Sequence, residues 1–457
     1  MSTIGVISLG CAKNQVNSEQ MLALIRDAGY ELRSELSDCD AVVVNTCGFI
    51  ESAKAEAIAE LLECIELKAQ GTLKAVIAAG CLAERYKREL LDEMPELDAI
   101  VGTGSYGEIV SVIDSVLNGV QTERYGDINT ALDESPRILT SPGGSAYLKI
   151  AEGCDNHCAY CVIPSIRGRY RSRAFEAVIS DAENLARQGV KELIVVAQDS
   201  TRYGLDLYGE RRLPELLHKL SEIDGIIWIR LHYLYPDEIS DALIAEVRDN
   251  PKIVKYLDIP VQHINSAILK AMNRRGDGEF IRRLFTRLRA EIPGLTLRTS
   301  VIVGLPGEGN AEFEELCAFL KEYKLERAGV FTYSPEEGTL AFDMPGAVHS
   351  ELAEHRAALV EELQSRIIDE WNESRVGTTQ DVLIEGYDEW GECYYGRTYA
   401  DSPDVDGKVY IANNSELSSN NSEQITNNKD GGLQVGSFVS VTITEVLDGD
   451  VIGEAAL

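Results

Sequence analysis

Short runs of hydrophobic residues alternate with helical stretches along residues 1–124. Three of these runs are Ile4–Leu9, Ala41–Asn45 and Ala75–Ala79. Runs of this length, separated by helices, are typical of an open and mostly parallel α/β sheet. We therefore expect residues 1–124 to form an N-terminal α/β domain.

A second alternation of strands and helices follows over residues 146–372. The segment before it, residues 125–145, is rich in Asp, Asn, Ser, Pro and Gly and predicts an interdomain linker. Six β/α units predict a partial (β/α)6 barrel with its chemistry at the carboxyl ends of the strands. A long amphipathic helix over Ser350–Val376 then leaves the barrel. The candidate strands are Tyr147–Ala151, Glu192–Ala197, Ile227–His232, Tyr256–Pro260, Thr296–Val303 and Ala328–Tyr333.

The pattern changes in residues 373–457 to short strands separated by Gly and Asp turns. Five such strands predict a small, all-β, OB-like barrel. An Asn- and Ser-rich stretch, residues 413–432, predicts a disordered insertion in a surface loop. The expected fold class is therefore α/β with a C-terminal β-barrel. The candidate strands are Asp381–Glu385, Glu392–Tyr399, Lys408–Ile411, Phe438–Val446 and Val451–Glu454.

Composition describes a protein without a membrane anchor. Hydrophobic residues make up 44% and charged residues 26% of the chain, as in soluble globular proteins. No apolar run approaches the roughly 20 residues that span a bilayer, and the N-terminus lacks the basic region of a signal peptide. We expect a cytoplasmic protein, in which thiols stay reduced and grouped cysteines act as metal ligands. The net charge of −32 repels polyphosphates and attracts basic proteins.

Cys154, Cys158 and Cys161, the central triad, follow the candidate strand Tyr147–Ala151. Three thiolates can hold three irons of a four-iron cluster and leave the fourth iron open to a substrate. The alternative is a structural zinc site, in which His157 would supply the fourth ligand. The spacing resembles that of the radical S-adenosyl-L-methionine (SAM) superfamily. In that superfamily the open iron binds SAM, and an electron from the cluster cleaves it to a 5′-deoxyadenosyl radical.

Cys11, Cys47 and Cys81, the N-terminal triad, each lie one or two residues beyond one of the first three hydrophobic runs. Open α/β sheets bind ligands at the carboxyl ends of their strands, and neighbouring strands lie about 5 Å apart. Three such cysteines can therefore converge on a second cluster. Any one of them alone could be an ordinary buried thiol, but the repeated placement favours a second three-thiolate site.

Several further segments carry a resemblance to a known family. They are Ser8–Asn14, Asn45–Ile50, Gly153–Cys161, Asp258–His263 and Ile302–Glu308. With the two triads, they make the chain similar to the MiaB/RimO methylthiotransferase family over nearly its whole length. That family joins an N-terminal cluster domain, a radical SAM barrel and a C-terminal TRAM domain. The RimO branch is the more similar, at Ala197–Gly204 and Gly396–Gly407, although Asn17 and Gly309 depart from the usual pattern.

The resemblance implies an enzyme that adds a methylthio group to the β-carbon of an aspartate in the twelfth small-subunit ribosomal protein. The alternative within the family is a tRNA adenosine methylthiotransferase. Two 4Fe-4S clusters on the triads, SAM, an external electron donor and a sulfur source are implied, with the chemistry carried by the clusters. Family analogy also makes five residues SAM contacts, although Tyr160 could equally pack beneath its loop. They are Tyr160, Gln198, Arg230, Gln262 and Gly304.

Charge distinguishes the two branches independently. Residues 377–457 contain three Lys or Arg and fifteen Asp or Glu, a net charge of −12. A tRNA-binding barrel must neutralise phosphates, so tRNA is an unlikely partner and a basic ribosomal protein suits this domain better. The alternative is a solvated acidic face without a partner.

Arg167, Arg169, Arg171 and Arg173 alternate just after the central triad. On an extended strand all four would point the same way and could bind the substrate aspartate or the SAM carboxylate. An exposed face paired with nearby acids is the other interpretation. Two different classes of protein are also open: an iron–sulfur redox carrier or scaffold, and a zinc-bound ribosome-associated factor.

Overall fold

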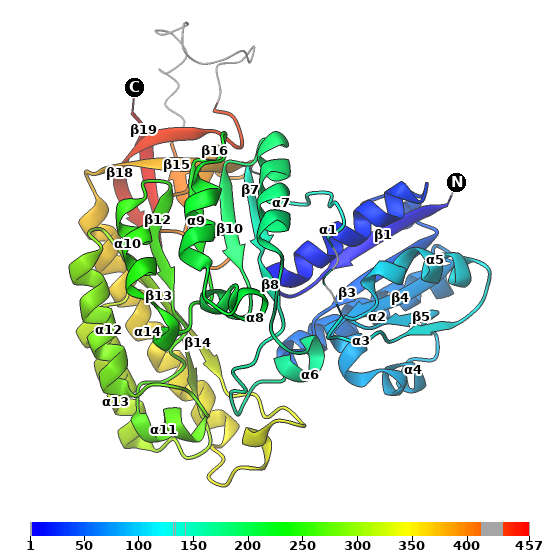
Figure 1. Ribbon diagram of the computed structural model, residues 1–457, viewed down its shortest axis with the longest axis horizontal. Helices are drawn as coiled ribbons and strands as arrows, with labels where there is room; N and C mark the ends of the chain where they lie inside the picture. The colour runs from blue at the N-terminus through cyan, green and yellow to red at the C-terminus, as the bar shows by residue number, and fades with distance from the viewer. Residues whose placement is uncertain (1, 131, 133, 142, 413–432, 457) are drawn as a thin grey trace, which may run out of the picture.

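The computed structural model describes residues 2–130, 132, 134–141, 143–412 and 433–456, and the expected insertion at 413–432 lies outside them. The chain forms an open parallel sheet, a six-stranded parallel partial barrel and a small closed β-barrel (Figure 1). The expected fold class is confirmed. None of the described helices is long and apolar enough to cross a membrane.

The N-terminal sheet has the strand order β2-β1-β3-β4-β5-β6, and all its strands are parallel. Every residue of β3 and β4 is buried, because helices cover both faces of the sheet and each face has its own hydrophobic core. The strands are β1 (Thr3–Ser8), β2 (Glu31–Leu32), β3 (Ala41–Thr46), β4 (Ala75–Gly80), β5 (Ala99–Val101) and β6 (Thr122–Arg124). The helices are α1 (Ala12–Asp27), α2 (Glu51–Ala69), α3 (Cys81–Tyr86), α4 (Arg88–Glu93) and α5 (Ile109–Leu117).

The central sheet has the order β14-β13-β12-β11-β10-β7, so it curves without closing between β7 and β14. Helices cover its outer face (Figure 1). All six expected strands are present, with ends within three residues of the expected ones. The strands are β7 (Ser145–Lys149), β10 (Glu192–Val196), β11 (Trp228–Leu231), β12 (Ile253–Asp258), β13 (Thr296–Val303) and β14 (Arg327–Thr332). The helices are α6 (Ile163–Arg167), α7 (Phe175–Arg187), α8 (Leu205–Tyr208), α9 (Leu213–Ser221), α10 (Asp241–Asp249), α11 (Ser266–Ala271), α12 (Gly278–Glu291) and α13 (Asn310–Tyr323).

The last helix of the barrel, α14 (Ser350–Arg375), leads into the closed β-barrel, as expected. The closed barrel has the order β15-β16-β17-β19-β18. It covers the amino-terminal ends of the central strands, opposite α6 (Figure 1). Its strands are β15 (Thr379–Asp388), β16 (Cys393–Arg397), β17 (Val409–Ile411), β18 (Phe438–Leu447) and β19 (Asp450–Ala455).

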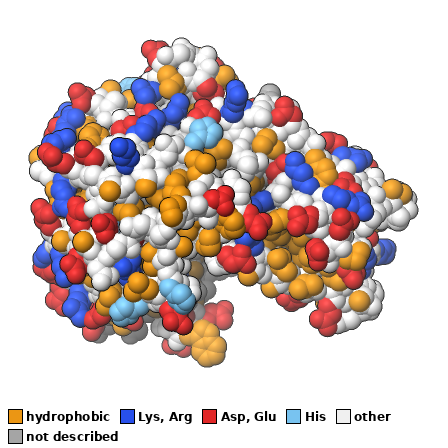
Figure 2. Space-filling model, turned by 90° about the horizontal axis from the view of Figure 1, so that it is seen from below, with side chains coloured by type: hydrophobic (Ala, Val, Ile, Leu, Met, Phe, Trp, Pro, Cys, Tyr) orange, Lys and Arg blue, Asp and Glu red, His pale blue; other side chains and the backbone are white. Residues whose placement is uncertain are grey.

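The connection between β6 and β7 fastens the N-terminal domain to the partial barrel. Arg137 pairs with Glu19 of α1 at 3.0 Å and with Asp181 of α7 at 3.3 Å. The backbone of Ile138 also donates to the carbonyl of Glu19. Figure 2 views the molecule from the end where the barrel strands finish, and shows hydrophobic side chains gathered between the two larger parts. The two domains therefore meet along α1 and at the carboxyl ends of both sheets.

Candidate functional site

The N-terminal triad lies at one edge of the N-terminal sheet. β1, β3 and β4 are neighbours in the sheet, and Thr46 at the end of β3 is paired with Gly80 at the end of β4. The loops after them touch, since a Cβ on Gly10 would lie 2.7 Å from the Cβ of Cys47. A Cβ on Gly48 would lie 2.8 Å from the backbone of Leu82, next to Cys81. Glycine at both positions lets the three cysteine loops pack together.

The loop of the central triad is bracketed by a short antiparallel pair, β8 (Ala151–Glu152) and β9 (Arg171–Ser172). Gly153 enters the loop with a φ of 77°, and a Cβ there would lie 2.0 Å from the carbonyl oxygen of Arg169, so only glycine fits. Asn156 donates to Asp199, beyond the end of β10, at 2.8 Å. His157, the alternative zinc ligand, is exposed.

Each triad receives a hydrogen bond from one arginine. Arg167 donates to the Sγ of Cys81 at 3.2 Å, and Arg274 donates to the Sγ of Cys158 at 3.7 Å. Arg167 follows the central triad in the chain but contacts a cysteine of the N-terminal triad. It therefore joins the two cysteine loops across the domain interface, where Cys81 also packs against Ile166.

The cysteines differ in their electrostatic surroundings. Burial raises the pKa of Cys47 and of Cys154 to about 11 in each case. At Cys11 burial also favours the thiol, but the charges of Lys13 and Arg167 outweigh it and the pKa is lowered. Cationic side chains thus compensate for burial at one end of the N-terminal triad.

Among the described residues, no three His, Cys, Asp or Glu side chains converge closely enough to hold one metal ion. A single zinc ion draws all its sulfur ligands to about 2.3 Å. Each cysteine of a four-iron cluster binds a different iron, so its ligands need not converge on one point. Three loops of the N-terminal domain carry one triad and a single loop of the partial barrel carries the other, and neither triad has the geometry of a single-ion site.

Glu152, two residues before Cys154, connects several of these groups. Its carboxylate accepts from Lys149 at 3.0 Å, from Arg167 at 3.1 Å and from Gln198 at 2.9 Å. Burial favours the neutral acid, but Arg167 and Lys149 hold the pKa of Glu152 well below its usual range. Glu152 is therefore a buried carboxylate that orients the cations behind both triads.

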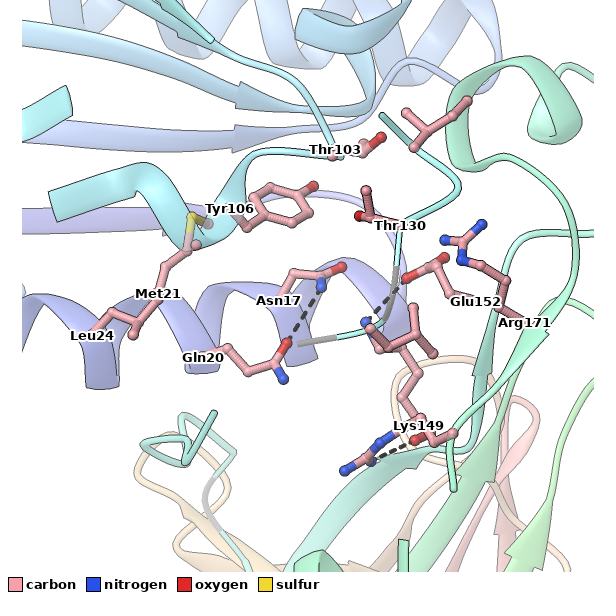
Figure 3. A pocket seen from close by; sticks show the side chains of 15 residues that line it. Asn17, Gln20, Met21, Leu24, Thr103, Tyr106, Thr130, Lys149, Glu152 and Arg171 are labelled. Atoms are coloured by element: carbon pink, nitrogen blue, oxygen red, sulfur yellow. Dashed lines mark hydrogen bonds and ion pairs between the residues drawn. The ribbon is translucent and has the colours of Figure 1, made fainter. Parts of the chain in front are cut away.

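A small cavity lies beside Glu152, between α1, the 103–107 loop and the interdomain connection (Figure 3). Its volume is about 90 Å³, below the roughly 300–1,000 Å³ of small-molecule pockets. Figure 3 shows Asn17 and Gln20 of α1 on one side, with Lys149 and Glu152 on the other. This cavity separates polar groups of the two domains and contains none of the six cysteines.

Four of the expected SAM contacts lie near the carboxyl ends of the barrel strands. Gln198 binds Glu152, and Gln262 has a φ of 69° and bridges to Val301 of β13. Gly304, with a φ of 80°, donates its N–H to Glu308 at 3.0 Å. Tyr160 packs in a hydrophobic cluster with residues of α11 and of the loop after β13. That contact agrees with the packing interpretation of Tyr160, and its role toward SAM stays a prediction.

Arg230, the fifth expected contact, is fully buried inside the partial barrel. Its guanidinium binds Glu192 at 2.8 Å and donates to the carbonyl of Tyr399, in the closed barrel, at 2.8 Å. Arg230 thus connects the partial barrel to the closed barrel. Its contact with SAM stays a prediction as well.

The expectation that four alternating arginines share one extended strand is wrong. Arg167 ends α6, Gly168 has a φ of 73°, and β9 contains only Arg171 of the four. Arg173 pairs with Asp181 at 2.9 Å, and Arg169 is exposed. The positive φ of Gly168 turns the chain between the arginines, so they point in different directions.

Two cations of the site were not assigned from the sequence. Lys13 stands in the matched segment Ser8–Asn14, and its position two residues after Cys11 was the available signal. Arg274 lies over 100 residues from Cys158 in the chain, and no local pattern connects them.

Three family descriptions match the chain. Uncharacterized protein family UPF0004 matches residues 3–102, Radical SAM superfamily matches 148–320, and TRAM domain matches 376–456. The ribosomal protein uS12 methylthiotransferase RimO of Thermoanaerobacter sp. (strain X514) is 46% identical over 455 residues, which are 99% of this chain and 100% of the relative. The protein of the same name from Lachnoclostridium phytofermentans is 47% identical over 450 residues, covering 98% of this chain and 99% of the relative.

Solved structures share the fold. The radical S-adenosylmethionine methyltransferase TsrM from Kitasatospora setae, with cobalamin and a [4Fe-4S] cluster bound, has a TM-score of 0.54 at 15% identity and covers 75% of this chain and 77% of its own. The cobalamin-dependent S-adenosylmethionine radical enzyme OxsB has a TM-score of 0.51 at 13% identity, covering 80% of this chain and 56% of its own. At identities this low, the similarity concerns the fold alone.

Proposed function

The chain belongs to the RimO family of radical SAM methylthiotransferases, and we propose that it methylthiolates the β-carbon of an aspartate in ribosomal protein uS12. The family and its radical SAM domain rest on full-length relatives. The substrate and the two-cluster chemistry are the proposal. A ribosomal substrate also agrees with a cytoplasmic site of action.

In this proposal each triad holds one 4Fe-4S cluster. When bound, the two clusters and SAM supply the radical chemistry and the methylthio group that convert an unactivated C–H bond into a C–S bond. Arg167 and Arg274 donate to a cysteine sulfur of each triad, and such hydrogen bonds stabilise the added negative charge of a reduced cluster. An external electron donor and a sulfur source complete the reaction.

The observation that carries the proposal is the contact of Arg167 with both cysteine loops. Its guanidinium touches the Sγ of Cys81 at 3.2 Å and the carboxylate of Glu152, two residues before Cys154, at 3.1 Å. A sulfur transfer between two clusters needs them to share one space, and this contact supports such an arrangement.

The charge of the closed barrel supports a basic protein substrate. Of its described basic residues, Arg397 is 1% exposed and pairs with Glu192, which leaves Lys408 at the surface. A tRNA-binding surface requires several exposed cations. An acidic barrel instead attracts a basic ribosomal protein.

The test is mass spectrometry of uS12 after anaerobic incubation with the reconstituted enzyme, SAM, sulfide and reductant. We expect the mass of one methylthio group on one aspartate. Cys154→Ala and Cys11→Ala should each abolish the product. Cys64→Ala should not, since Cys64 is a buried thiol of α2 outside both triads.

Two outcomes would contradict the proposal. Unmodified uS12 alongside methylthiolated tRNA would assign the chain to the tRNA-modifying activity. Failure to form 5′-deoxyadenosine from SAM under reducing conditions would favour an iron–sulfur carrier or scaffold.

A further inference from the structure

Lys13 is a buried cation with an unusual set of neighbours. Lys13 is the second residue of α1, two residues after Cys11, and is 7% exposed. Its Nζ lies 3.5 Å from the centroid of the Tyr233 ring. No Asp or Glu oxygen of the described residues lies within 4.0 Å of this Nζ. The Cys11 sulfur and the aromatic face offset part of the cost of burying this ammonium, but no carboxylate pairs with it.

The other buried cations around the two triads do have acceptors. Lys149 and Arg167 share Glu152, Arg173 binds Asp181, and Arg274 donates to the carbonyl of Pro260. Among these described cations, Lys13 and Arg274 have no carboxylate partner, and Lys13 is the one that also has no carbonyl acceptor.

The Tyr233 ring is held in place beneath Lys13. Tyr233 follows β11 with a φ of 59°, a left-handed conformation that a large residue adopts only when its surroundings enforce it. Its N–H donates to Asp258 at 3.2 Å, and its carbonyl accepts from Ser200 at 3.0 Å. Contacts at the carboxyl ends of three neighbouring strands, β10, β11 and β12, thus hold the backbone of Tyr233. Lys13 therefore reaches from the N-terminal domain onto the carboxyl end of the barrel.

A larger cavity of about 510 Å³ opens between the N-terminal domain, β7 and the closed barrel. Gln15 of α1, two residues after Lys13, lies on its wall. Three acids and two basic residues line the wall: Arg397 is paired with Glu192 and with the wall's own Glu385, and Lys408 is exposed. The exposed Asp404 would attract a basic polypeptide. The acids are Glu385, Asp404 and Asp406.

We propose that Lys13 binds the carboxylate of the substrate aspartate. The inference rests on the proposed function and names the group that recognises the modified residue. The β-carbon of aspartate is bonded directly to its carboxylate, so an ammonium on that carboxylate fixes the position of the reacting carbon. Lys13 adjoins Cys11 of one triad and lies over the barrel that carries the other, which places the held carbon between them. Lys13 is a positioning and specificity residue in this arrangement.

The experiment measures equilibrium binding of fluorescently labelled uS12 to the anaerobic, cluster-loaded full-length enzyme with SAM and without reductant. It compares wild-type uS12 with uS12 in which the modified aspartate, identified by mass spectrometry, is changed to asparagine. With the wild-type enzyme we expect the asparagine form to bind about 10- to 100-fold more weakly, as befits the loss of a charge-assisted hydrogen bond. With Lys13→Met the two forms should bind alike, and Lys13→Arg should restore discrimination.

Lys68→Met is the matched control, because Lys68 pairs with Asp98 on the far side of the same domain. It should discriminate as the wild type does. Iron content and SAM affinity are measured for each variant. If Lys13→Met loses iron, Lys13→Gln replaces it in the binding comparison.

Three results would overturn the inference while leaving the proposed function intact. They are unchanged discrimination in Lys13→Met, equal loss of binding for both forms of uS12, and loss of SAM binding in place of uS12 binding. A wild-type enzyme that binds SAM but leaves uS12 unmodified would instead overturn the proposed function, and the inference with it.

Discussion

Arg167 and Arg169 are two residues apart and have opposite surroundings. Arg167 is 2% exposed and binds Glu152, Asn14 and the Sγ of Cys81, whereas Arg169 is exposed. If Cys81 ligates the proposed cluster, a guanidinium on its sulfur favours the reduced cluster and raises its potential. The pair therefore offers a test of electrostatic control at the N-terminal triad.

We expect Arg167→Met to lower the midpoint potential of the cluster proposed on the N-terminal triad, measured by anaerobic redox titration followed by EPR. The central cluster, with its own donor Arg274, should keep its potential. Loss of one partner from a buried pair should also cost about 3–5 kcal/mol of stability. Arg169→Met should change neither quantity, and equal shifts in both clusters would contradict a local role.

The sequence pointed to the cysteines because Cys154, Cys158 and Cys161 are closely spaced, whereas Cys11, Cys47 and Cys81 each follow the end of a strand. It could not show which arginine contacts a triad, since Arg167, Arg169 and Arg171 occupy equivalent positions in the alternating pattern. Their roles separate only because Gly168 turns the chain at a φ of 73° and directs Arg167 toward α1. Lys13 and Arg274 likewise gain their roles from contacts with distant parts of the chain.

The elements of the two barrels are joined by buried charges. Glu192 at the start of β10 binds Arg230 of β11 at 2.8 Å and Arg397 of β16 at 2.6 Å. All three residues are at most 1% exposed. Arg397 also pairs with Glu385 of its own barrel at 2.7 Å, so Glu192 is the carboxylate that connects the closed barrel to the partial barrel.

Glu192→Gln should destabilise the protein by about 3–5 kcal/mol, because it leaves the buried Arg230 without an anion and removes one of the two carboxylates at Arg397. Chemical unfolding followed by tryptophan fluorescence would measure this, since Trp228 packs against Phe438 of the closed barrel. Glu215→Gln is the control: Glu215 is exposed and pairs on the surface with Arg212, so its loss should cost within about 0.5 kcal/mol. Equal effects of the two substitutions would refute the anchoring role.

Asp401, in the loop after β16, makes the same interface sensitive to acid. Burial favours its neutral form, but Arg375 and Arg327 outweigh burial and lower the pKa of Asp401 from 3.8 to about 2. A folded-state pKa below the unfolded value stabilises the protein above about pH 4, and the contribution disappears as the pH falls toward 2.

We expect Asp401→Asn to cost about 2 kcal/mol at pH 7 and almost nothing near pH 2, measured as the stability difference from the wild type at each pH. The difference isolates Asp401 from the other acids that titrate in the same range. A cost that does not change between pH 7 and pH 2 would show that the pKa of Asp401 is not lowered.

At the scale of elements, the strands were predictable because they are short hydrophobic runs buried on both faces, as in β3 and β4. β12 shows the limit. It begins at Ile253 instead of Tyr256, because pairing with neighbouring strands extends it past the apolar run through Lys255. The docking of the closed barrel through Glu192 could not be predicted from a local sequence pattern, since Glu192 binds Arg230 in one domain and Arg397 in another.

The charge of the whole molecule determines how it meets a substrate. The net charge of −32 gives a long-range field that draws a basic protein in and repels tRNA, while acids and bases are interspersed on the face in Figure 2. Attraction therefore concentrates where acids dominate, as on the closed barrel. Salt screens such exposed charges more strongly than buried ones, and the Debye length is about 10 Å at 0.1 M.

The association rate of uS12, measured by stopped-flow fluorescence, should fall about tenfold or more between about 0.05 and 0.5 M salt. Dissociation should change less, because contacts buried at the site are screened weakly.

Asp404→Asn, at an exposed acid of the 510 Å³ cavity, should slow the association of uS12 and reduce its salt dependence. Glu93→Gln, at an exposed acid on α4 of the N-terminal domain, should do so less. If the two variants behave alike, the field of the whole molecule steers uS12 without a preferred entrance; if salt has no effect on association, the acidity of the closed barrel has no part in substrate capture.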